Sequence, residues 1–352
     1  MTAPTRKDFS SDNITGVAPA ILAAVAAAGA GTVHSYGADP ATERLRAAAD
    51  ALFERPVTIL PVATGTAANA IALSVLARPW QAIYCPASAH VNTDECGAPE
   101  FFSGGAKLMG LPSTDGRLVC GQVTEAVAFA RSMGVHHVEP AAVTLSQATE
   151  WGTIYDLDRL HALCDEAHGL GLRVHVDGAR FANAIARLGC SVADATWRAG
   201  VDALSFGATK NGALAAEAIV VFDATLGAEL EYRRKRSGHL WSKHRFLSAQ
   251  LLAYLEEDRW LSHARNANAV ADRLAAGLAE VVGARLLQPV EANELFIRLP
   301  PAVIGALRDA GFEFYDWPAP AGTDGPVVRL VTSWDMTASD ADALVATARR
   351  AA

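Results

Sequence analysis

Long apolar runs are missing from this sequence, although 51% of its 352 residues are hydrophobic. A membrane-spanning helix needs about 20 consecutive apolar residues. The nearest stretch is the alanine-rich segment 18–30, which is too short and is bracketed by Pro19, Gly29 and Gly31. Residues 1–12 contain no apolar core of the signal-peptide kind. We therefore predict a cytoplasmic globular protein without a membrane segment.

Paired cysteines and metal-ligand spacings are also missing. The number of cysteines is odd, and no Cys-x-x-Cys occurs among Cys85, Cys96, Cys120, Cys164 and Cys190. This argues against a disulfide framework and a zinc knuckle, so we expect reduced thiols in or near the core. The ten histidines show no helix pair with ligand spacing, and neighbours such as His136 and His137 rarely face one metal ion. We therefore predict no metal site.

Basic clusters are scarce as well. The formal net charge is −8, and the densest basic run, 232–236, lies in a helical pattern. Such a run is more typical of a solvated helix face than of a contact surface. Without a wider basic face, nucleic-acid binding is not expected. We predict a small-molecule partner instead.

What the sequence does contain is a regular alternation of short apolar runs with longer helical patterns. The runs predicted to be strands buried on both faces are 57–62, 82–85, 142–145, 172–176 and 203–206. Residues 156–168 begin with acidic residues and end before Gly169 and Gly171, as a helix does. This alternation is typical of an α/β domain with a mostly parallel sheet.

After about Arg245 the pattern changes. A long helical region continues to residue 282, and short strands and helices follow at 295–299, 301–310, 327–331 and 339–350. We expect a smaller α+β domain that closes against the first. The predicted division is an N-terminal arm, a large domain and a small domain, over residues 1–16, 17–244 and 245–352.

The residues that follow the first two predicted strands suit a phosphate and a flat ring. Ligands of such a sheet bind beyond the carboxyl ends of its strands. The run 57–62 leads to Gly65 and Thr66, which open a helix whose N-terminal amides can bind phosphate. Thr66 could equally be only a helix cap. His90 follows the run 82–85 and is either structural or a ring that stacks on a planar cofactor.

Two later strand ends carry an acid and an amine. Asp177 follows the run 172–176, and Arg180 comes three residues later. They form either a buried ion pair or two ligand contacts, one to a ring nitrogen and one to a carboxylate. Lys210 lies in "FGATKNGA", where small neighbours leave room for a ring and Thr209 offers a hydroxyl to a phosphate. An apolar pocket favours the neutral amine, which forms Schiff bases with aldehydes.

A phosphate cradle, a stacking ring, an aspartate and a Schiff-base lysine, in this order, fit pyridoxal 5′-phosphate. Specific motifs accompany them: "FSSDNITG", "YGADP", "GTAANA", "AHVNTDECGAPEFFSGG", "HVDGARFANA", "TKNG" and "VVRLVTSWD". With these motifs nearly the whole chain resembles the low-specificity L-threonine aldolases, in the β-eliminating-lyase branch of fold type I enzymes. The block "DECGAPEFF" is most similar to a bacterial subgroup that also accepts phenylserine-like substrates.

The resemblance implies an aspartate aminotransferase-like fold, with a mostly parallel seven-stranded sheet in the large domain and a small C-terminal α+β domain. It implies that Lys210 forms the Schiff base with the cofactor, that Asp177 pairs with the ring nitrogen and that His90 stacks on the ring. The expected phosphate contacts are Gly65, Thr66 and Thr209.

The resemblance also implies how substrate and subunits are arranged. The substrate carboxylate would be held by Ser11, Arg180 and Arg329. Tyr36 and Arg245 match positions near the phosphate that a neighbouring subunit supplies. A homotetramer is expected, built from dimers with shared active sites.

One segment departs from the family. Many members carry a histidine in an Asn-Thr-His segment after the strand predicted here at 142–145, and it has been proposed to serve the substrate hydroxyl. This chain has "SQATEWGT", with Thr149 and Glu150 near that place. The identity of the general base is therefore open. His90, acting through a water, is the first candidate and Glu95 is the second.

The implied reaction is aldol cleavage of L-threonine, L-allo-threonine or a related β-hydroxy-α-amino acid to glycine and an aldehyde. The arginines would set the Cα–Cβ bond perpendicular to the cofactor ring while a base takes the β-hydroxyl proton. A β-eliminating lyase or an aminotransferase with the same cofactor is the alternative. A non-catalytic cofactor-binding scaffold is disfavoured, because it has no use for a desolvated amine.

Overall fold

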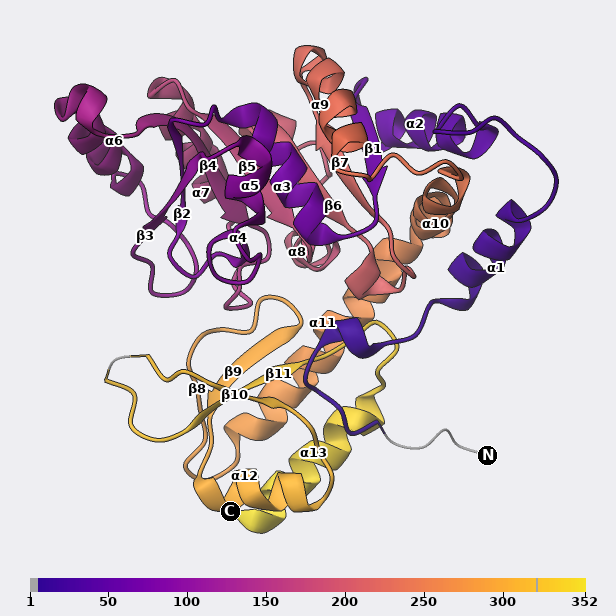
Figure 1. Ribbon diagram of the computed structural model, residues 1–352. Helices are drawn as coiled ribbons and strands as arrows, with labels where there is room; N and C mark the ends of the chain where they lie inside the picture. Colours follow the sequence, from indigo (N-terminus) through magenta and orange to yellow (C-terminus); the bar gives the residue numbers. More distant parts are fainter. Residues whose placement is uncertain (1–5, 321) are drawn as a thin grey trace.

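The computed structural model describes residues 6–320 and 322–352 and has two domains, one above the other in Figure 1. The large domain is built on a seven-stranded sheet and the small domain on a four-stranded sheet. The predicted α/β fold is confirmed. Residues 1–5 of the predicted N-terminal arm lie outside the described residues. Residues 6–9 run along the small domain, where Arg6 N donates to Asp340 and Phe9 N to the Glu313 carbonyl.

The large sheet has the strand order β1-β7-β6-β5-β4-β2-β3. From β6 to β3 all neighbouring strands are parallel, whereas β7 is antiparallel to both β1 and β6. The expectation of a mostly parallel sheet is therefore confirmed. The strands are β1 (Thr58–Val62), β2 (Gln81–Pro86), β3 (Lys107–Leu111), β4 (Glu139–Ser146), β5 (Arg173–Gly178), β6 (Ala203–Gly207) and β7 (Glu217–Val221).

Helices cover the large sheet on both faces, which explains why its central strands are apolar throughout. The helix predicted at 156–168 is confirmed, and the Asp156 side chain caps it by accepting a hydrogen bond from Arg159 N at 2.8 Å. The helices of this part of the chain are α1 (Pro19–Ala28), α2 (Pro40–Leu52), α3 (Gly65–Leu76), α4 (His90–Thr93), α5 (Ala98–Ser103), α6 (Gln122–Ser132), α7 (Leu157–Gly169), α8 (Phe181–Leu188), α9 (Ala224–Arg236) and α10 (Arg245–Leu255).

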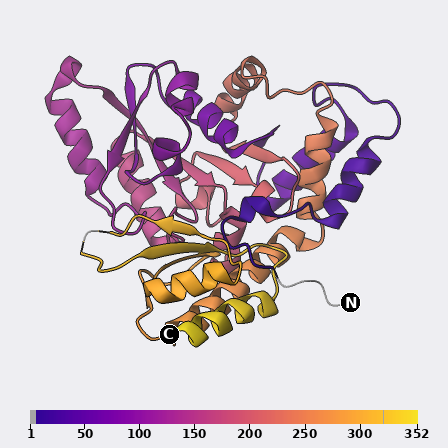
Figure 2. The ribbon, with the colours of Figure 1, turned by 60° about the horizontal axis from the view of Figure 1, so that its bottom comes forward.

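The small domain has an antiparallel sheet of order β10-β11-β9-β8. Figure 2 shows this sheet between its own helices and the large domain, so the sheet faces the region where the domains meet. Its elements are α11 (Arg259–Ala279), β8 (Arg285–Leu286), β9 (Glu294–Arg298), α12 (Pro301–Asp309), β10 (Tyr315–Trp317), β11 (Val327–Val331) and α13 (Ala338–Ala351).

The long helical region expected after Arg245 is interrupted. Glu257 and Asp258 adopt left-handed backbone angles, with φ of 57° and 51°, between α10 and α11. Helix α10 packs against α1 and α2, whereas α11 leads into the small domain (Figure 1). The boundary placed between residues 244 and 245 stays a prediction.

A close backbone approach joins the ends of β5 and β6. A Cβ atom at Gly207 would lie 2.6 Å from the Ala179 carbonyl oxygen and 2.8 Å from that of Gly178. Backbone atoms cannot yield as a flexible side chain does, so only glycine fits there. This contact brings the residues after β5 against the turn that carries Lys210.

Two expectations about core and surface are wrong in part. Cys85 and Cys164 are buried, but Cys96 and Cys120 are exposed rather than near the core. Arg234, in the basic run of α9, is buried and donates to Glu231 and to the His244 ring, so this run is not solvated throughout. Within the described ranges, no helix combines the length and apolar character that crossing a membrane requires.

Candidate active site

A cavity of about 550 Å³ lies where β4, β5 and β6 end and α3 begins. It contains most of the residues expected to bind cofactor or substrate. Its walls include Thr64, Gly65, Thr66, Asn69, His90, Glu95, Ser146, Glu150, Asp177, Ala179, Arg180, Thr209, Lys210 and Glu217. Residues separated by up to 204 positions in the chain, from Asn13 to Glu217, thus meet at one edge of the sheet.

The N-terminus of α3 forms the anion-binding end of this cavity. Thr64 is the N-cap, and its side chain accepts a hydrogen bond from Ala67 N at 3.2 Å. The alternative that Thr66 is the helix cap is therefore wrong. The amides of Gly65 and Thr66, within the described chain, have no hydrogen-bond partner. Free amides at a helix N-terminus bind a phosphate well, because the helix dipole adds to the hydrogen bonds.

Asp177 ends β5 and is fixed by two protein donors. Its Oδ2 accepts from Asn69 Nδ2 at 2.8 Å, and its Oδ1 accepts from the Ala179 amide at 3.0 Å. Both oxygens are thus oriented before any ligand binds. Asn69 also donates to Glu95 Oε1 at 2.7 Å, so it positions two acids at once. The motif "GTAANA" contains this asparagine, but its role could not be recognised without the fold.

His90 begins the short helix α4 and pairs with Glu95 across the cavity wall. Its Nδ1 lies 2.8 Å from Glu95 Oε1. The hydrogen bond to Glu95 raises the pKa of His90, and burial raises the pKa of Glu95. Among the described residues, the side-chain atoms of His90, Glu95 and Asp177 lie within 4.8 Å of one another, as metal ligands can. Each acid already accepts hydrogen bonds from protein donors, which suits a ring-binding site better than an ion site.

Lys210 lies in a one-turn 3₁₀ helix directly after β6 and lines the cavity. Its surroundings differ from the apolar pocket that we expected, because Asp12 and Glu217 both lie within electrostatic reach. Burial raises the pKa of Glu217 to about 7, although Thr209, the Ala208 amide and Lys210 oppose the rise. The small residues around "FGATKNGA" did not reveal these acids, since Asp12 comes from a distant segment and Glu217 stands at the start of β7, after the alanine-rich stretch that follows the turn.

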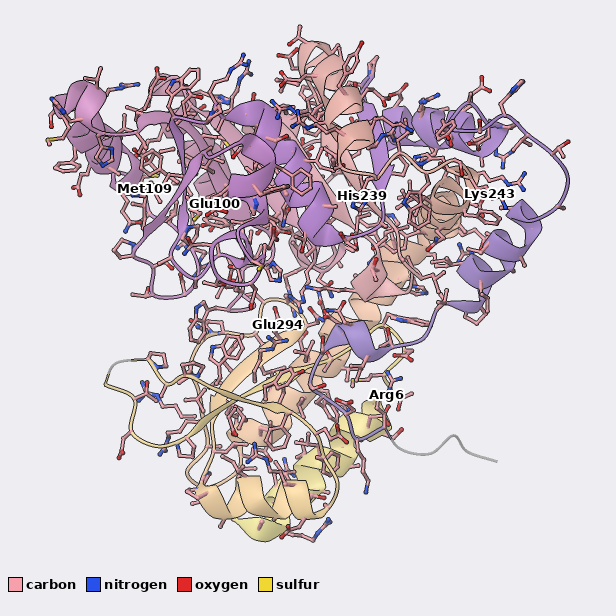
Figure 3. The ribbon with its side chains drawn as sticks, viewed as in Figure 1. Arg6, Glu100, Met109, His239, Lys243 and Glu294 are labelled. Carbon is pink, nitrogen blue, oxygen red and sulfur yellow. The ribbon has the colours of Figure 1, made fainter. Side chains whose placement is uncertain are left out.

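Arg180 is fully engaged in ion pairs. Its Nε and NH2 donate to Asp12 at 2.7 and 2.9 Å, and its NH1 lies 3.2 Å from Glu294. Burial alone would raise the pKa of Asp12, but Arg180 and Lys210 hold it below its usual value. Figure 3 shows Glu294 at the boundary between the domains. The arginine therefore joins the N-terminal arm, the large domain and the small domain.

The other residues expected at the substrate carboxylate lie beside this network. Arg329, on β11, has its Nε 3.6 Å from Glu294 and is not part of the cavity wall. Ser11 caps a 3₁₀ turn by accepting from Asn13 N at 3.1 Å. Asn13, which we did not single out, does line the cavity.

Tyr36 and Arg245 lie outside the cavity. Arg245 lines a separate cavity of about 330 Å³ between α1, α2 and α10, and Tyr36 lines a third with Lys235 and Lys243. Lys235 Nζ stands 4.5 Å from the centre of the Tyr36 ring. A single chain does not bring these two residues to the other site residues.

The segment "SQATEWGT" places Glu150 in the cavity wall. Its Oε1 accepts from Ser146 Oγ at 2.5 Å and from the His90 amide at 2.9 Å. Burial raises the pKa of Glu150 to about 7, in spite of these two hydrogen bonds. Thr149, by contrast, is not part of the cavity wall and bonds to Thr153 at 2.8 Å.

The residues present fit pyridoxal 5′-phosphate. The cavity has free amides for a phosphate at α3, a histidine ring, an oriented carboxylate for a ring nitrogen and an amine for an aldehyde. Three buried polar atoms in its wall, Asn69 Oδ1, Glu95 Oε2 and Glu150 Oε2, have no partner within the described residues. Such atoms carry a free-energy cost that a bound polar ligand can remove.

Comparisons with known proteins agree on one family. The model of the beta-eliminating lyase family matches residues 8–300. The low specificity L-threonine aldolase of Pseudomonas sp. (strain NCIMB 10558) is 43% identical over 329 residues, 94% of this chain and 93% of the relative. That of Pseudomonas aeruginosa is 43% identical over 335 residues, 95% of this chain and 94% of its own length. A solved threonine aldolase from Leishmania major is 29% identical, covers 98% of this chain and 99% of its own, and has a TM-score of 0.91.

Proposed function

Because the chain belongs to the beta-eliminating lyase family, whose members use pyridoxal 5′-phosphate, we propose that this lyase cleaves β-hydroxy-α-amino acids to glycine and an aldehyde. The proposed substrates are L-threonine and L-allo-threonine, with phenylserine as a further one. The convergence of Lys210, Asp177, His90 and the α3 N-terminus on one cavity supports this proposal most directly. The names of the two Pseudomonas relatives support the substrate class.

The cavity residues suggest how the cofactor would be held. When bound, pyridoxal 5′-phosphate supplies an aldehyde and a ring that accepts electrons. Lys210 Nζ would bind the aldehyde, and the Asp177 carboxylate would hold a proton on the ring nitrogen. The amides of Gly65 and Thr66, with the Thr209 hydroxyl, would bind the phosphate. The His90 ring would pack on the ring face and exclude water.

Arg180 is placed to orient the substrate carboxylate, with Arg329 and Ser11 as proposed helpers. A guanidinium has five donors in a rigid fork, so it can contact a second carboxylate while it keeps Asp12. Because Glu294 neutralises part of the same guanidinium, substrate binding would exchange one acidic partner for another. Fixing the carboxylate in this way sets the rotation about Cα and so selects the bond to be broken.

Product identity tests the proposed function. Purified enzyme with its cofactor should release glycine and an aldehyde from L-threonine, L-allo-threonine or L-phenylserine, detected by aldehyde reduction and amino-acid chromatography. A β-eliminating lyase would instead give a keto acid and ammonia, and an aminotransferase would need a keto-acid partner. Absence of aldehyde from all these substrates would refute the proposal. A non-catalytic cofactor-binding scaffold would release no product, and its visible absorption would not change when glycine is added.

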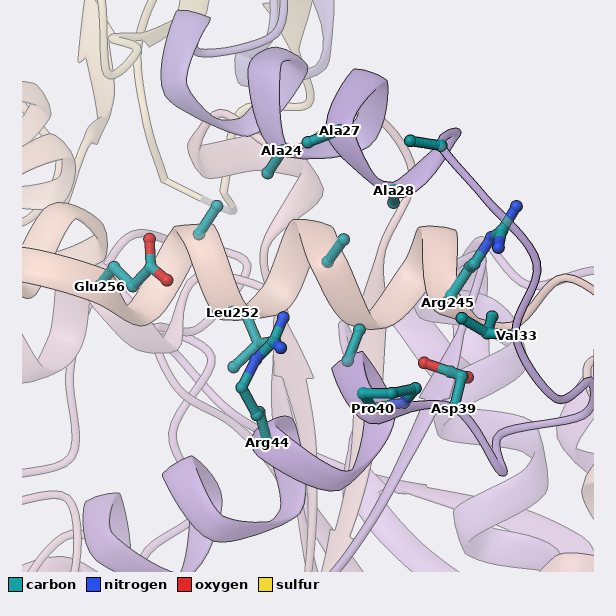
Figure 4. A pocket seen from close by; sticks show the side chains of 14 residues that line it. Ala24, Ala27, Ala28, Val33, Asp39, Pro40, Arg44, Arg245, Leu252 and Glu256 are labelled. Atoms are coloured by element: carbon teal, nitrogen blue, oxygen red, sulfur yellow. The ribbon is translucent and has the colours of Figure 1, made fainter.

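We also propose that copies of this chain assemble into a homotetramer of dimers with shared sites. Exposed apolar side chains near α1 support this, since Leu22 on α1 is 53% exposed and Val33 is 45% exposed. Val33 also lines the cavity between α1, α2 and α10 (Figure 4). A second copy on this side would cover these side chains and could bring Tyr36 and Arg245 to its neighbour's phosphate. Sedimentation velocity should report a tetramer, and a monomer that is fully active would contradict the proposal.

We place the protein in the cytoplasm on the basis of its free cysteines. All five are unpaired in the structure, and reduced thiols persist in reducing compartments. Cell fractionation that finds the protein outside the cytoplasm would refute this placement.

A further inference from the structure

Glu150 is fixed at the edge of the cavity through one of its two oxygens. Oε1 takes both hydrogen bonds, from the Ser146 hydroxyl and from the His90 amide. Ser146 ends β4 and lies in register with Asp177 on the parallel strand β5. The carboxylate is therefore held near the acid expected to face the cofactor's ring nitrogen, on a rigid strand end.

The second oxygen, Oε2, is buried and has no hydrogen-bond partner within the described residues. A buried acceptor without a donor costs free energy unless a ligand supplies one. A substrate hydroxyl can supply that donor. We propose that Glu150 is the acid–base group that exchanges the proton of the substrate's β-hydroxyl. This assignment rests on the proposed function and gives a residue of the cavity wall a part in the proton transfer.

The two other candidates for this role are less suited. His90 has its Nδ1 bonded to Glu95, and that bond favours the protonated ring, which cannot accept a proton. Glu95 Oε2, like that of Glu150, has no partner among the described residues, but Glu95 Oε1 bonds to the ionisable His90 ring as well as to Asn69, so this acid orients its neighbours. Glu150, by contrast, has no cationic partner at hydrogen-bond distance among residues 6–320 and 322–352.

The proposed step is balanced without a further reactant. In cleavage the hydroxyl O–H bond breaks and its proton moves to Glu150 Oε2. The O–H electron pair becomes the second bond of the aldehyde carbonyl, and the Cα–Cβ pair stays on the glycine carbon. In condensation the protonated Glu150 returns its proton to the carbonyl oxygen as the Cα–Cβ bond forms.

The environment of Glu150 suits proton transfer near neutral pH. A general base works best when its pKa is close to the operating pH, and burial raises the pKa of Glu150 to about 7. The base must be ionised, so cleavage should rise with pH through this pKa. The charged and titratable groups around Glu150 are Asp177, Arg180, His90, Glu95, Cys85 and Tyr155. Since the hydrogen bond to Glu95 also raises the pKa of His90, variants are needed to assign the acidic limb of the pH–rate profile.

Glu150→Gln separates the proton transfer from cofactor binding. The amide keeps an oxygen that can accept from Ser146 and His90, so the local fold should persist. We expect the rate of aldehyde release to fall by about 10²- to 10⁴-fold, the usual contribution of a general base. The visible absorption of the bound cofactor should not change. Exchange of the glycine α-hydrogen with D₂O, followed by NMR, should also continue, because it involves no β-hydroxyl.

Ser146→Ala serves as the matched control. It removes one hydrogen bond from Glu150 Oε1 and leaves the carboxylate in place. Because that hydrogen bond lowers the pKa of Glu150, its loss should raise the pKa and move the acidic limb of the pH–rate profile to higher pH. In Glu150→Gln the acidic limb of the pH–rate profile should no longer include the ionisation of this carboxylate. A purely structural role would predict neither shift.

The outcomes distinguish this assignment from the proposed function. Wild-type cleavage rates in Glu150→Gln would overturn the role of Glu150 and leave the proposed function intact. Loss of glycine exchange together with cleavage would also overturn it, since the residue would then only support the cofactor. If the wild-type enzyme released no aldehyde from any substrate, the proposed function and this assignment would both fall.

Discussion

Replacing Lys210 by alanine should abolish amino-acid cleavage and the visible absorption of the bound cofactor. Lys210 is the lysine that lines the cavity, at the end of β6 and against the close backbone contact at Gly207. Without its amine no covalent bond to the cofactor aldehyde can form. Covalent catalysis divides one difficult step into two easier ones, and its loss leaves only non-covalent binding. We expect turnover below detection, measured as aldehyde release beside an absorption spectrum.

The control for this variant is Lys107→Ala, which removes an exposed lysine on β3 and should leave both readouts unchanged. Borohydride treatment of the wild-type protein, followed by peptide mass mapping, locates the covalent adduct directly. An adduct at another lysine, or activity that persists in Lys210→Ala, would show that this amine does not bind the cofactor.

The strands that sequence reasoning found are the ones with continuous apolar runs. β1, β2, β4, β5 and β6 all match predicted segments, because strands covered on both faces must be apolar throughout. β3 was missed because exposed Lys107 and Gly110 interrupt its run at the sheet edge. β7 was missed because it begins with the charged Glu217, which is buried beside the Lys210 turn. A buried acid at the start of this core strand therefore obscured its apolar pattern.

The residues found at strand ends were also the ones that local patterns could reveal. Gly65, His90, Asp177 and Lys210 each follow a predicted strand, and the fold brings all four to one cavity. The pairing of Arg180 with Asp12 could not be predicted, since the two are separated by 168 positions and come from different parts of the fold. The same holds for Asn69, whose amide orients Asp177 across 108 positions. Contacts of this kind depend on tertiary structure alone.

Asp177→Asn should lower the rate strongly while the cofactor stays bound. Both Asp177 oxygens already accept protein hydrogen bonds, from Asn69 and the Ala179 amide. An asparagine has a single acceptor oxygen, so its NH₂ group must face either a protein donor or the ring nitrogen. In each case the negative charge that stabilises a protonated ring nitrogen is lost.

Removing one oriented electrostatic partner from a catalytic site typically costs about 10²- to 10³-fold in rate, and we expect a loss of this size in aldehyde release. Lys210 is unchanged in this variant, so its visible absorption should persist, unlike that of Lys210→Ala. Asp165→Asn makes the same charge change on α7, where the side chain is 70% exposed, and should have no effect. A wild-type rate in Asp177→Asn would mean that the ring nitrogen does not depend on this carboxylate. Loss of the cofactor itself would instead assign Asp177 to binding, because the variant removes the charge and keeps the shape of the side chain.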